Sequence, residues 1–219
     1  MTLDTQSVDR PAAALFGAAL SGEPCLVHGL HGHPQRLPMR RWMSPADASD
    51  AALLAHCDGP VIDIGCGPGR MSEHLAALGV EVLGIDIVPE AVLSTRVRGA
   101  SAVRRNVFDR LPGEGAWVSA LLADGNIGIG GDPVLLLRRV AELLAPGGWV
   151  VADLAPPGSG LATRSVQLEC AGRRSMPFRW AMLGPDSIHE VAARAGLQVD
   201  AVHEHDGRWF VVLVKTEQP

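Results

Sequence analysis

The chain has 219 residues, of which 47% are hydrophobic and 20% are charged, and its formal net charge is -5 at pH 7. This length fits one α/β domain with additional segments, and the composition argues against a disordered or fibrous protein. The acidic balance argues against a nucleic-acid partner, because surfaces that bind nucleic acid need a surplus of Lys and Arg on one face.

The first expected helix lies at the apolar run Ala12–Leu20. Asp4 and Asp9 precede this run and no small-residue cleavage site follows it, so we interpret it as an amphipathic helix and not as a signal peptide. No stretch of the sequence approaches the roughly 18 apolar residues of a membrane-spanning helix. We therefore expect a cytoplasmic protein without membrane contact.

A run of potential metal ligands follows, with the pattern Cys25-x-x-His28-x-x-His31-x-His33. These residue types bind zinc, but no matching second ligand pair is evident, so we expect an irregular loop and no metal. Imidazole titrates near neutral pH, which makes a histidine of this run a candidate active-site base, and we select His31.

The four cysteines are far apart in the sequence, at Cys25, Cys57, Cys66 and Cys170. They form no C-x-x-C pair and no dense framework of the kind found in disulfide-rich domains. We therefore expect reduced thiols in a reducing compartment.

From residue 60 onward, short β-like runs alternate with helical stretches, a pattern that predicts a parallel sheet with crossover helices. The predicted strands are Pro60–Ile64, Glu81–Asp86, Ala102–Arg105, Trp117–Leu122 and Gly148–Leu154. The predicted helices between them are Arg70–Leu78, Pro89–Arg98 and Asp132–Leu144.

The C-terminal part departs from this alternation. A helix predicted at Pro185–Ala195 leads into two strand-like runs, Gln198–Glu204 and Trp209–Lys215, and the Asp206-Gly207 turn between them is a strong hairpin signal. The predicted fold is therefore an α/β, seven-stranded, mostly parallel, doubly wound sheet that ends in an antiparallel hairpin and carries helices on both faces.

The most informative motif is Val61-Ile-Asp-Ile-Gly65-Cys-Gly67-Pro-Gly69-Arg70. A strand that runs into three alternate glycines and then into a helix lets the backbone pass close to a ligand. Asp86 ends the second predicted strand, where a carboxylate can accept two hydrogen bonds from a ribose diol. A G-x-G-x-x-G dinucleotide fingerprint would need a small residue at position 70, so Arg70 counts against the alternative of an NAD(P)-dependent oxidoreductase.

The chain resembles the class I (Rossmann-like) S-adenosylmethionine (SAM)-dependent methyltransferases in five ordered places. The matching positions are the first motif at 61–69, the ribose-binding acid at Asp86, the adenine-side motif at 105–112, the fourth-strand motif at 121–126 and the turn into the fifth strand at 144–151. The resemblance implies a SAM-dependent methyltransferase with SAM as its cofactor.

The resemblance also implies which residues hold SAM. The glycines at 65, 67 and 69 would line its methionine part, Asp86 would hold the ribose, and Asn106 and Val107 would flank the adenine. The complete implied set is Asp63, Gly65, Cys66, Gly67, Gly69, Asp86, Ile87, Asn106, Val107 and Asp124. The family usually carries Asp where this chain has Asn106, and Asn can both accept from the adenine amino group and donate to a ring nitrogen.

Asp124 and Asn126 follow the fourth predicted strand, from which this fold presents groups to the methyl acceptor. They are our catalytic candidates together with His31, although Asx side chains in a glycine-rich loop commonly bond to their own backbone. The loop lacks the Asp/Asn-Pro-Pro-aromatic signature of enzymes that methylate nucleic-acid amino groups. We therefore expect a small-molecule acceptor, with O-, N- or C-methylation and the oligomeric state left open.

Two segments, Ser21–Pro45 and Ala155–Leu183, lie outside the predicted scaffold. We expect residues 1–57 to form a helical and loop segment that covers the active site, residues 58–219 to form the SAM-binding domain, and residues 155–183 to be a substrate-cover insertion. The aromatic residues of these segments, Trp42, Phe178 and Trp180, either line an apolar pocket or pack in the core. A non-catalytic protein with a SAM-binding fold remains an alternative function.

Overall fold

The computed structural model describes residues 11–215. Its N-terminal part contains helix α1 (Ala12–Leu20), strands β1 (Cys25–His28) and β2 (Gln35–Arg36), and helices α2 (Met39–Met43) and α3 (Ala48–Leu54). The helix expected at the first apolar run is therefore confirmed. Among the described residues, no helix combines the length and the apolar character that crossing a membrane requires.

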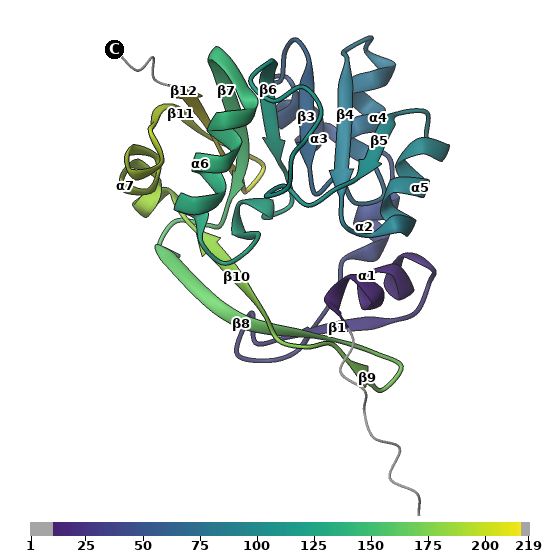
Figure 1. The fold of residues 1–219 in the computed structure, drawn as a ribbon. Coiled ribbons are helices and arrows are strands. Elements are labelled where there is room, and N and C mark those ends of the chain that lie inside the picture. Colours follow the sequence, from purple (N-terminus) through teal and green to yellow (C-terminus); the bar gives the residue numbers. More distant parts are fainter. Residues whose placement is uncertain (1–10, 216–219) are drawn as a thin grey trace, which may run out of the picture.

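The large sheet contains the seven predicted strands. They are β3 (Val61–Ile64), β4 (Val82–Asp86), β5 (Ser101–Arg104), β6 (Trp117–Leu122), β7 (Leu144–Leu154), β11 (Leu197–His205) and β12 (Arg208–Lys215), in the order β11-β12-β7-β6-β3-β4-β5. The first five run parallel, whereas β12 pairs antiparallel with both β7 and β11. The predicted fold class is thus confirmed (Figure 1).

Helices cover both faces of this sheet. The helices after β3 are α4 (Arg70–Ala77), α5 (Pro89–Val97), the short 3-10 helix η1 (Asn126–Gly128), α6 (Pro133–Leu143) and α7 (Pro185–Ala195). Apolar residues of α6 and α7 pack in one core cluster, and those of α3 and α4 pack in a second cluster with the strands. The chain order reverses between β3 and β6, and such a switch point is where open α/β sheets bind ligands.

Strand β7 begins earlier than the sequence indicates. Its pairing with β6 starts at Leu144 and shifts register before Trp149. Gly147 lies in this irregular stretch with φ +70°, and a Cβ at Gly148 would approach the carbonyl oxygen of Val118 to 2.9 Å. The two glycines that the sequence analysis assigned to a turn therefore allow an irregular continuation of the strand.

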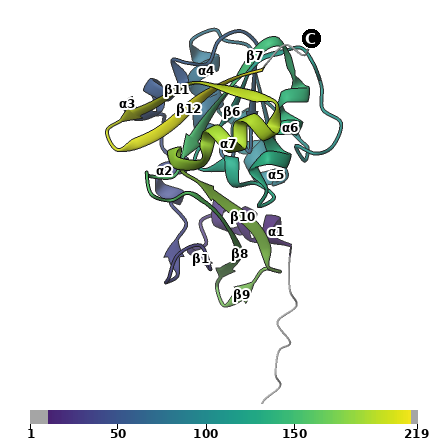
Figure 2. The ribbon, with the colours of Figure 1, turned by 90° about the vertical axis from the view of Figure 1, so that its left-hand side faces the viewer.

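A second, antiparallel sheet was not predicted. Its strands are β1, β2, β8 (Leu161–Cys170), β9 (Arg173–Arg174) and β10 (Phe178–Leu183), in the order β10-β8-β1-β2 with β9 paired to β8. We call it the cap sheet. It joins the two segments that were expected to be loops, and it lies below the carboxyl ends of the parallel strands in Figure 1 and beside α1 in both views (Figures 1 and 2).

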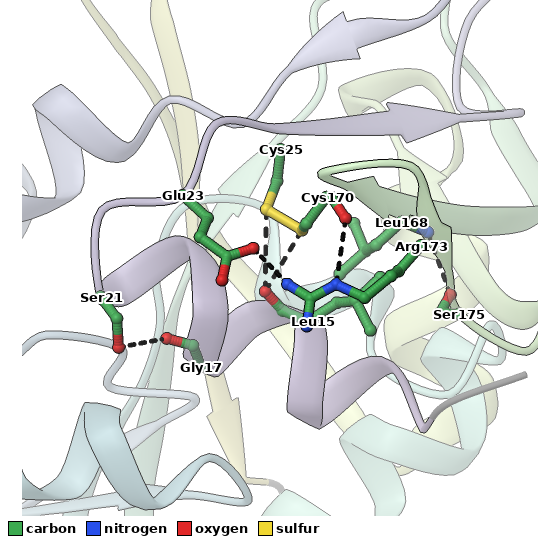
Figure 3. Close-up of a disulfide and its surroundings, with 9 residues drawn as sticks. All are labelled: Leu15, Gly17, Ser21, Glu23, Cys25, Leu168, Cys170, Arg173 and Ser175. Atoms are coloured by element: carbon green, nitrogen blue, oxygen red, sulfur yellow. Dashed lines mark hydrogen bonds and ion pairs between the residues drawn. A yellow bond between two sulfur atoms is a disulfide. The ribbon is translucent and has the colours of Figure 1, made fainter. Parts of the chain in front are cut away.

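The cap sheet contains a disulfide. β1 pairs with β8 so that Cys25 faces Cys170, with 4.3 Å between their Cα atoms, and the two sulfur atoms are bonded. Figure 3 shows this bond beside Leu15 of α1. The expectation of reduced thiols is therefore wrong for this pair, because it overlooked the strand pairing. Cys57 and Cys66 are free and buried.

Candidate active site

The glycine-rich turn and the carboxylate of the second parallel strand meet at one cavity. The backbone N–H of Gly67 donates to Oδ2 of Asp86 at 3.0 Å, and that of Val88 donates to Oδ1 at 2.8 Å. Burial raises the pKa of Asp86 above its usual value, whereas these hydrogen bonds favour the charged form. Gly67 and Asp86 both line a cavity of about 640 Å³, which is large enough for a ligand of drug size.

The three glycines of the turn have different roles. Gly65, Gly67 and Gly69 all have left-handed backbone angles, with φ of +71°, +55° and +91°. A Cβ at Gly65 would lie 2.7 Å from Nδ2 of Asn126, and a Cβ at Gly69 would lie 2.6 Å from Oγ1 of Thr95. A Cβ at Gly67 would meet no protein atom within 4 Å, so the space beside it is open to a ligand. Gly69 does not line the cavity but allows α4 to pack against α5.

Asp63 places a buried carboxyl group under the turn. Its side chain is 1% exposed, lines the cavity and accepts a hydrogen bond from the hydroxyl of Ser72 at 2.6 Å. The pKa of Asp63 is raised to about 7, mainly by burial and also by the nearby carboxylates of Asp124 and Asp86, while the hydrogen bond from Ser72 opposes this shift. A cationic ligand group in this part of the cavity would stabilise the charged form.

Apolar and amide side chains line the cavity beyond Asp86. Ile87 and Phe108 line it with 46% and 40% of their surface exposed, while Val107 is buried beside them. Oδ1 of Asn106 accepts the backbone N–H of Phe108 at 3.1 Å, and its Nδ2 group has no hydrogen bond to another described residue. This arrangement offers apolar contact and a hydrogen-bond donor to a flat polar ring.

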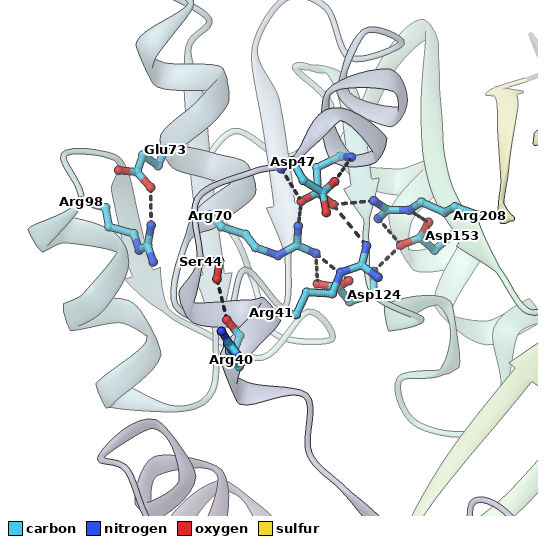
Figure 4. A network of polar contacts seen from close by, with 11 residues as sticks. Arg40, Arg41, Ser44, Asp47, Arg70, Glu73, Arg98, Asp124, Asp153 and Arg208 are labelled. Atoms are coloured by element: carbon cyan, nitrogen blue, oxygen red, sulfur yellow. Dashed lines mark hydrogen bonds and ion pairs between the residues drawn. The ribbon is translucent and has the colours of Figure 1, made fainter. Parts of the chain in front are cut away.

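Asp124 connects the cavity to a network of charged residues (Figure 4). It follows β6 with φ +53° and lines the cavity. Nη2 of Arg70, which is 3% exposed, lies 2.7 Å from both carboxylate oxygens of Asp124. The backbone N–H of Asp124 donates to the carboxylate of Asp153 in β7. The side chain and backbone of Asp124 are therefore held from two directions.

The network extends from Asp124 and Arg70 to further charged residues. Arg70 and Arg208 both donate to Asp50 of α3, and Arg208 also donates twice to Asp153 at 2.6 Å. Arg41 of α2 lies 3.5 Å from Asp50. Buried charges of this kind must be paired, because an isolated one loses its hydration without compensation.

This network was not predicted. The sequence motif indicates Arg70 only as a departure from a dinucleotide fingerprint, although the charged Asp153 inside the apolar run of β7 is a detectable signal. The other members come from distant segments, so their pairing has no local sequence pattern.

Asn126 links two loops. Its Nδ2 group donates to the carbonyl oxygens of Ile64 and Gly65, both at 2.9 Å. The side chain therefore fixes the loop after β6 against the glycine turn. Asn126 lines the cavity, as do all the implied cofactor-binding residues except Gly69.

The far wall of the cavity comes from α1, α2 and the cap sheet. This wall is mainly apolar and includes Ala12, Ala13, Phe16, Leu20, Val27, Leu37, Met39, Trp42, Val166, Leu168, Phe178 and Trp180. Of the two alternatives for Trp42, Phe178 and Trp180, the structure supports the pocket wall. Residues of α1, α2 and the cap sheet thus enclose the side of the cavity opposite the glycine turn.

His31 lies elsewhere. It is exposed and is not among the residues that line the cavity. Cys25 of the same run is bonded to Cys170, so it is not free to bind a metal. The irregular loop expected for this run is wrong for Cys25–His28, which form β1.

Solved structures share this fold. A SAM-dependent methyltransferase from Bacteroides fragilis in complex with S-adenosyl-L-homocysteine superposes with a TM-score of 0.78 at 20% identity, covering 94% of this chain and 95% of that chain. The 1,6-didemethyltoxoflavin-N1-methyltransferase from Burkholderia thailandensis superposes with a TM-score of 0.63 at 19% identity and covers 99% of both chains.

Curated relatives match part of the chain. A ubiquinone biosynthesis O-methyltransferase from Cereibacter sphaeroides is 28% identical over 146 residues, or 63% of this chain and 59% of the relative. One from Xanthomonas oryzae pv. oryzae is 35% identical over 104 residues, or 45% of this chain and 44% of the relative. The chain therefore spans three fifths or less of the length of these relatives.

A family model decides the assignment. The model of the methyltransferase domain matches residues 39–202, which contain the glycine turn, Asp86 and the loop after β6. This match confirms the family that the motifs imply. The chain belongs to the methyltransferase-domain family, and its fold is that of class I SAM-dependent methyltransferases.

Proposed function

We propose that this chain transfers the methyl group of SAM to a small organic molecule bound under the cap sheet. The observation that carries the proposal is the single cavity that runs from Gly67 and Asp86 to the apolar wall of the cap. One end offers the groups that a SAM molecule needs, and the other is enclosed by residues of the segments 1–57 and 155–183. We propose that these two segments cover the substrate.

The residues at the first end fit SAM. Asp86 retains acceptor capacity for the ribose hydroxyls, and the buried carboxyl group of Asp63 favours the cationic methionine end. The open space beside Gly67 lets the methionine part pass close to the backbone, together with Gly65 and Cys66. Further along, the adenine would lie against Ile87 and Val107, with Asn106 as a hydrogen-bond partner.

When bound, SAM would supply a methyl group from its sulfonium. A lone pair of the acceptor would attack the methyl carbon in line with the C–S bond, and the sulfur would leave with the electrons of that bond. The protein therefore contributes mainly by holding the acceptor atom near the methyl carbon and excluding water. Asp124, fixed by Arg70, lies where it can accept a hydrogen bond from the acceptor. Asn126 acts as a positioning residue because its amide holds the glycine turn.

The relatives support a small-molecule acceptor. Curated relatives are named for ubiquinone biosynthesis, and one structural neighbour holds 1,6-didemethyltoxoflavin. The methyltransferase family match removes the support for the NAD(P)-dependent alternative. The proposal does not use His31, because this residue lies outside the cavity.

The test combines binding with turnover. Calorimetry is expected to show saturable binding of SAM, and methyl-labelled SAM is expected to label a member of a panel of small phenols, amines and heterocycles. Absence of SAM binding would overturn the proposal. SAM binding without transfer to any acceptor would favour the alternative of a non-catalytic binding protein.

A further inference from the structure

The cap wall of the cavity contains a group of aromatic side chains. The ring centroids of Phe178 and Trp180, which lie on β10, are 6.4 Å apart with an interplanar angle of 89°. Phe16 of α1 lies edge-on to Phe178 at 6.4 Å. All three rings line the cavity and none is fully buried, so part of each ring remains accessible to a ligand. Aromatic walls of this kind favour flat apolar ligands.

Trp180 also lies next to the loop that follows β6. A Cβ at Gly128 would approach Nε1 of Trp180 to 2.7 Å, and Ile129 forms an isolated β-bridge with Trp180. The same loop carries Asn126, which lines the cavity. The indole therefore lies at the boundary between the cap and the loop that faces the methyl acceptor.

The polar residues of this wall include the charged side chains of Arg36 and Arg179 and the uncharged donors of Trp180 and Gln35. The indole N–H of Trp180 has no hydrogen-bond partner among residues 11–215, in contrast to that of Trp149, which donates to the carbonyl oxygen of His56 at 2.8 Å. The amide of Gln35 on β2 also lines the cavity without a partner among these residues. A ligand with a carbonyl oxygen or a ring nitrogen would offer these donors a hydrogen-bond acceptor.

We propose that the methyl acceptor is a flat aromatic or heteroaromatic ring with a hydrogen-bond acceptor, and that Trp180 is a specificity-determining residue that donates its indole N–H to this group, while the rings of Phe16 and Phe178 contact the flat ring. The inference rests on the proposed function, because it assigns the cap end of the same cavity to the acceptor. A cation held by the aromatic rings is the competing interpretation.

Three probes with similar ring sizes separate these interpretations. 2-Quinolone is flat, neutral and carries a carbonyl oxygen, naphthalene lacks the oxygen, and 2-naphthylmethylammonium carries a positive charge. Calorimetry of the full chain saturated with S-adenosylhomocysteine measures the affinity of each probe. We expect 2-quinolone to bind most tightly, and the Trp180→Phe variant to weaken it about 2- to 12-fold, the effect of one neutral hydrogen bond.

The variants provide the controls. Trp180→Phe keeps an aromatic ring, so its affinity for naphthalene is expected to change less than about twofold, and Trp149→Phe makes the same chemical change away from the cavity and is expected to leave all three probes unaffected. Tighter binding of the ammonium probe, no binding of 2-quinolone, or equal losses for 2-quinolone and naphthalene would overturn the inference. If S-adenosylhomocysteine still binds in the same samples, such a result contradicts only this inference. If S-adenosylhomocysteine does not bind, the proposed function itself fails.

Discussion

Removal of Arg208 is expected to destabilise the fold strongly. Its guanidinium group donates to Asp50 and Asp153, whose side chains are 1% and 9% exposed, and Arg208 itself is 10% exposed. Burial lowers the pKa of Arg208, but hydrogen bonding to Asp153 raises it more, so the net pKa lies above the usual value and the residue is charged at all relevant pH values. Asp153 has no other ion-pair partner among the described residues.

The Arg208→Met variant keeps an apolar stem but leaves the carboxylate of Asp153 buried and unpaired. Removing one partner of a buried ion pair costs about 3–5 kcal/mol, and we expect this loss in the free energy of unfolding. The exposed pair Arg194–Glu190 provides a matched control, because Arg194→Met is expected to cost less than about 0.5 kcal/mol. Urea denaturation followed by circular dichroism measures both values. A loss below about 1 kcal/mol for Arg208→Met would refute the role given to the network.

Three further changes test other parts of the structure. Gly65→Ala should abolish SAM binding in calorimetry, because its Cβ would lie 2.7 Å from Asn126 at a left-handed φ, and unchanged affinity would contradict this. The pKa of Asp63 is raised to about 7 from 3.8, so the folded chain retains a proton that the unfolded chain releases. The free energy of unfolding should therefore fall as pH rises from 4 to 7. This slope should flatten in the Asp63→Asn variant, and equal slopes for the two proteins would contradict the prediction. Replacing Cys25 and Cys170 by Ala should lower the free energy of unfolding by about 2–4 kcal/mol and remove the effect of reducing agents, since the bond joins positions 145 residues apart; a persistent effect would contradict it.

The parallel scaffold could be predicted because each of its elements has a local signal. The apolar run 61–64 enters a glycine turn, Asp206-Gly207 marks the hairpin, and Gly196 ends α7 in a left-handed conformation. These signals lie within a few residues of the element that they define. The same holds for Asp86, whose position at the end of β4 follows from the strand alone.

The cap sheet could not be predicted in this way. β1 lies in a segment rich in Gly, Pro and His, and its partner β8 lies more than 130 residues later in the chain. The buried alternation of Val166, Leu168 and Cys170 in β8 was a visible strand signal, but it does not reveal which strand it pairs with. The disulfide was missed for the same reason, since it depends on this long-range pairing.

The geometry of Asp86 at the glycine turn is the central claim, and calorimetric titration of SAM into the Asp86→Ala variant tests it most directly. Loss of hydrogen bonds to one charged carboxylate is expected to weaken SAM binding about 10- to 150-fold. The control variant Asp200→Ala removes an exposed carboxylate on β11 and should bind SAM with the affinity of the unchanged chain. An affinity of Asp86→Ala within twofold of that of the unchanged chain would contradict the account.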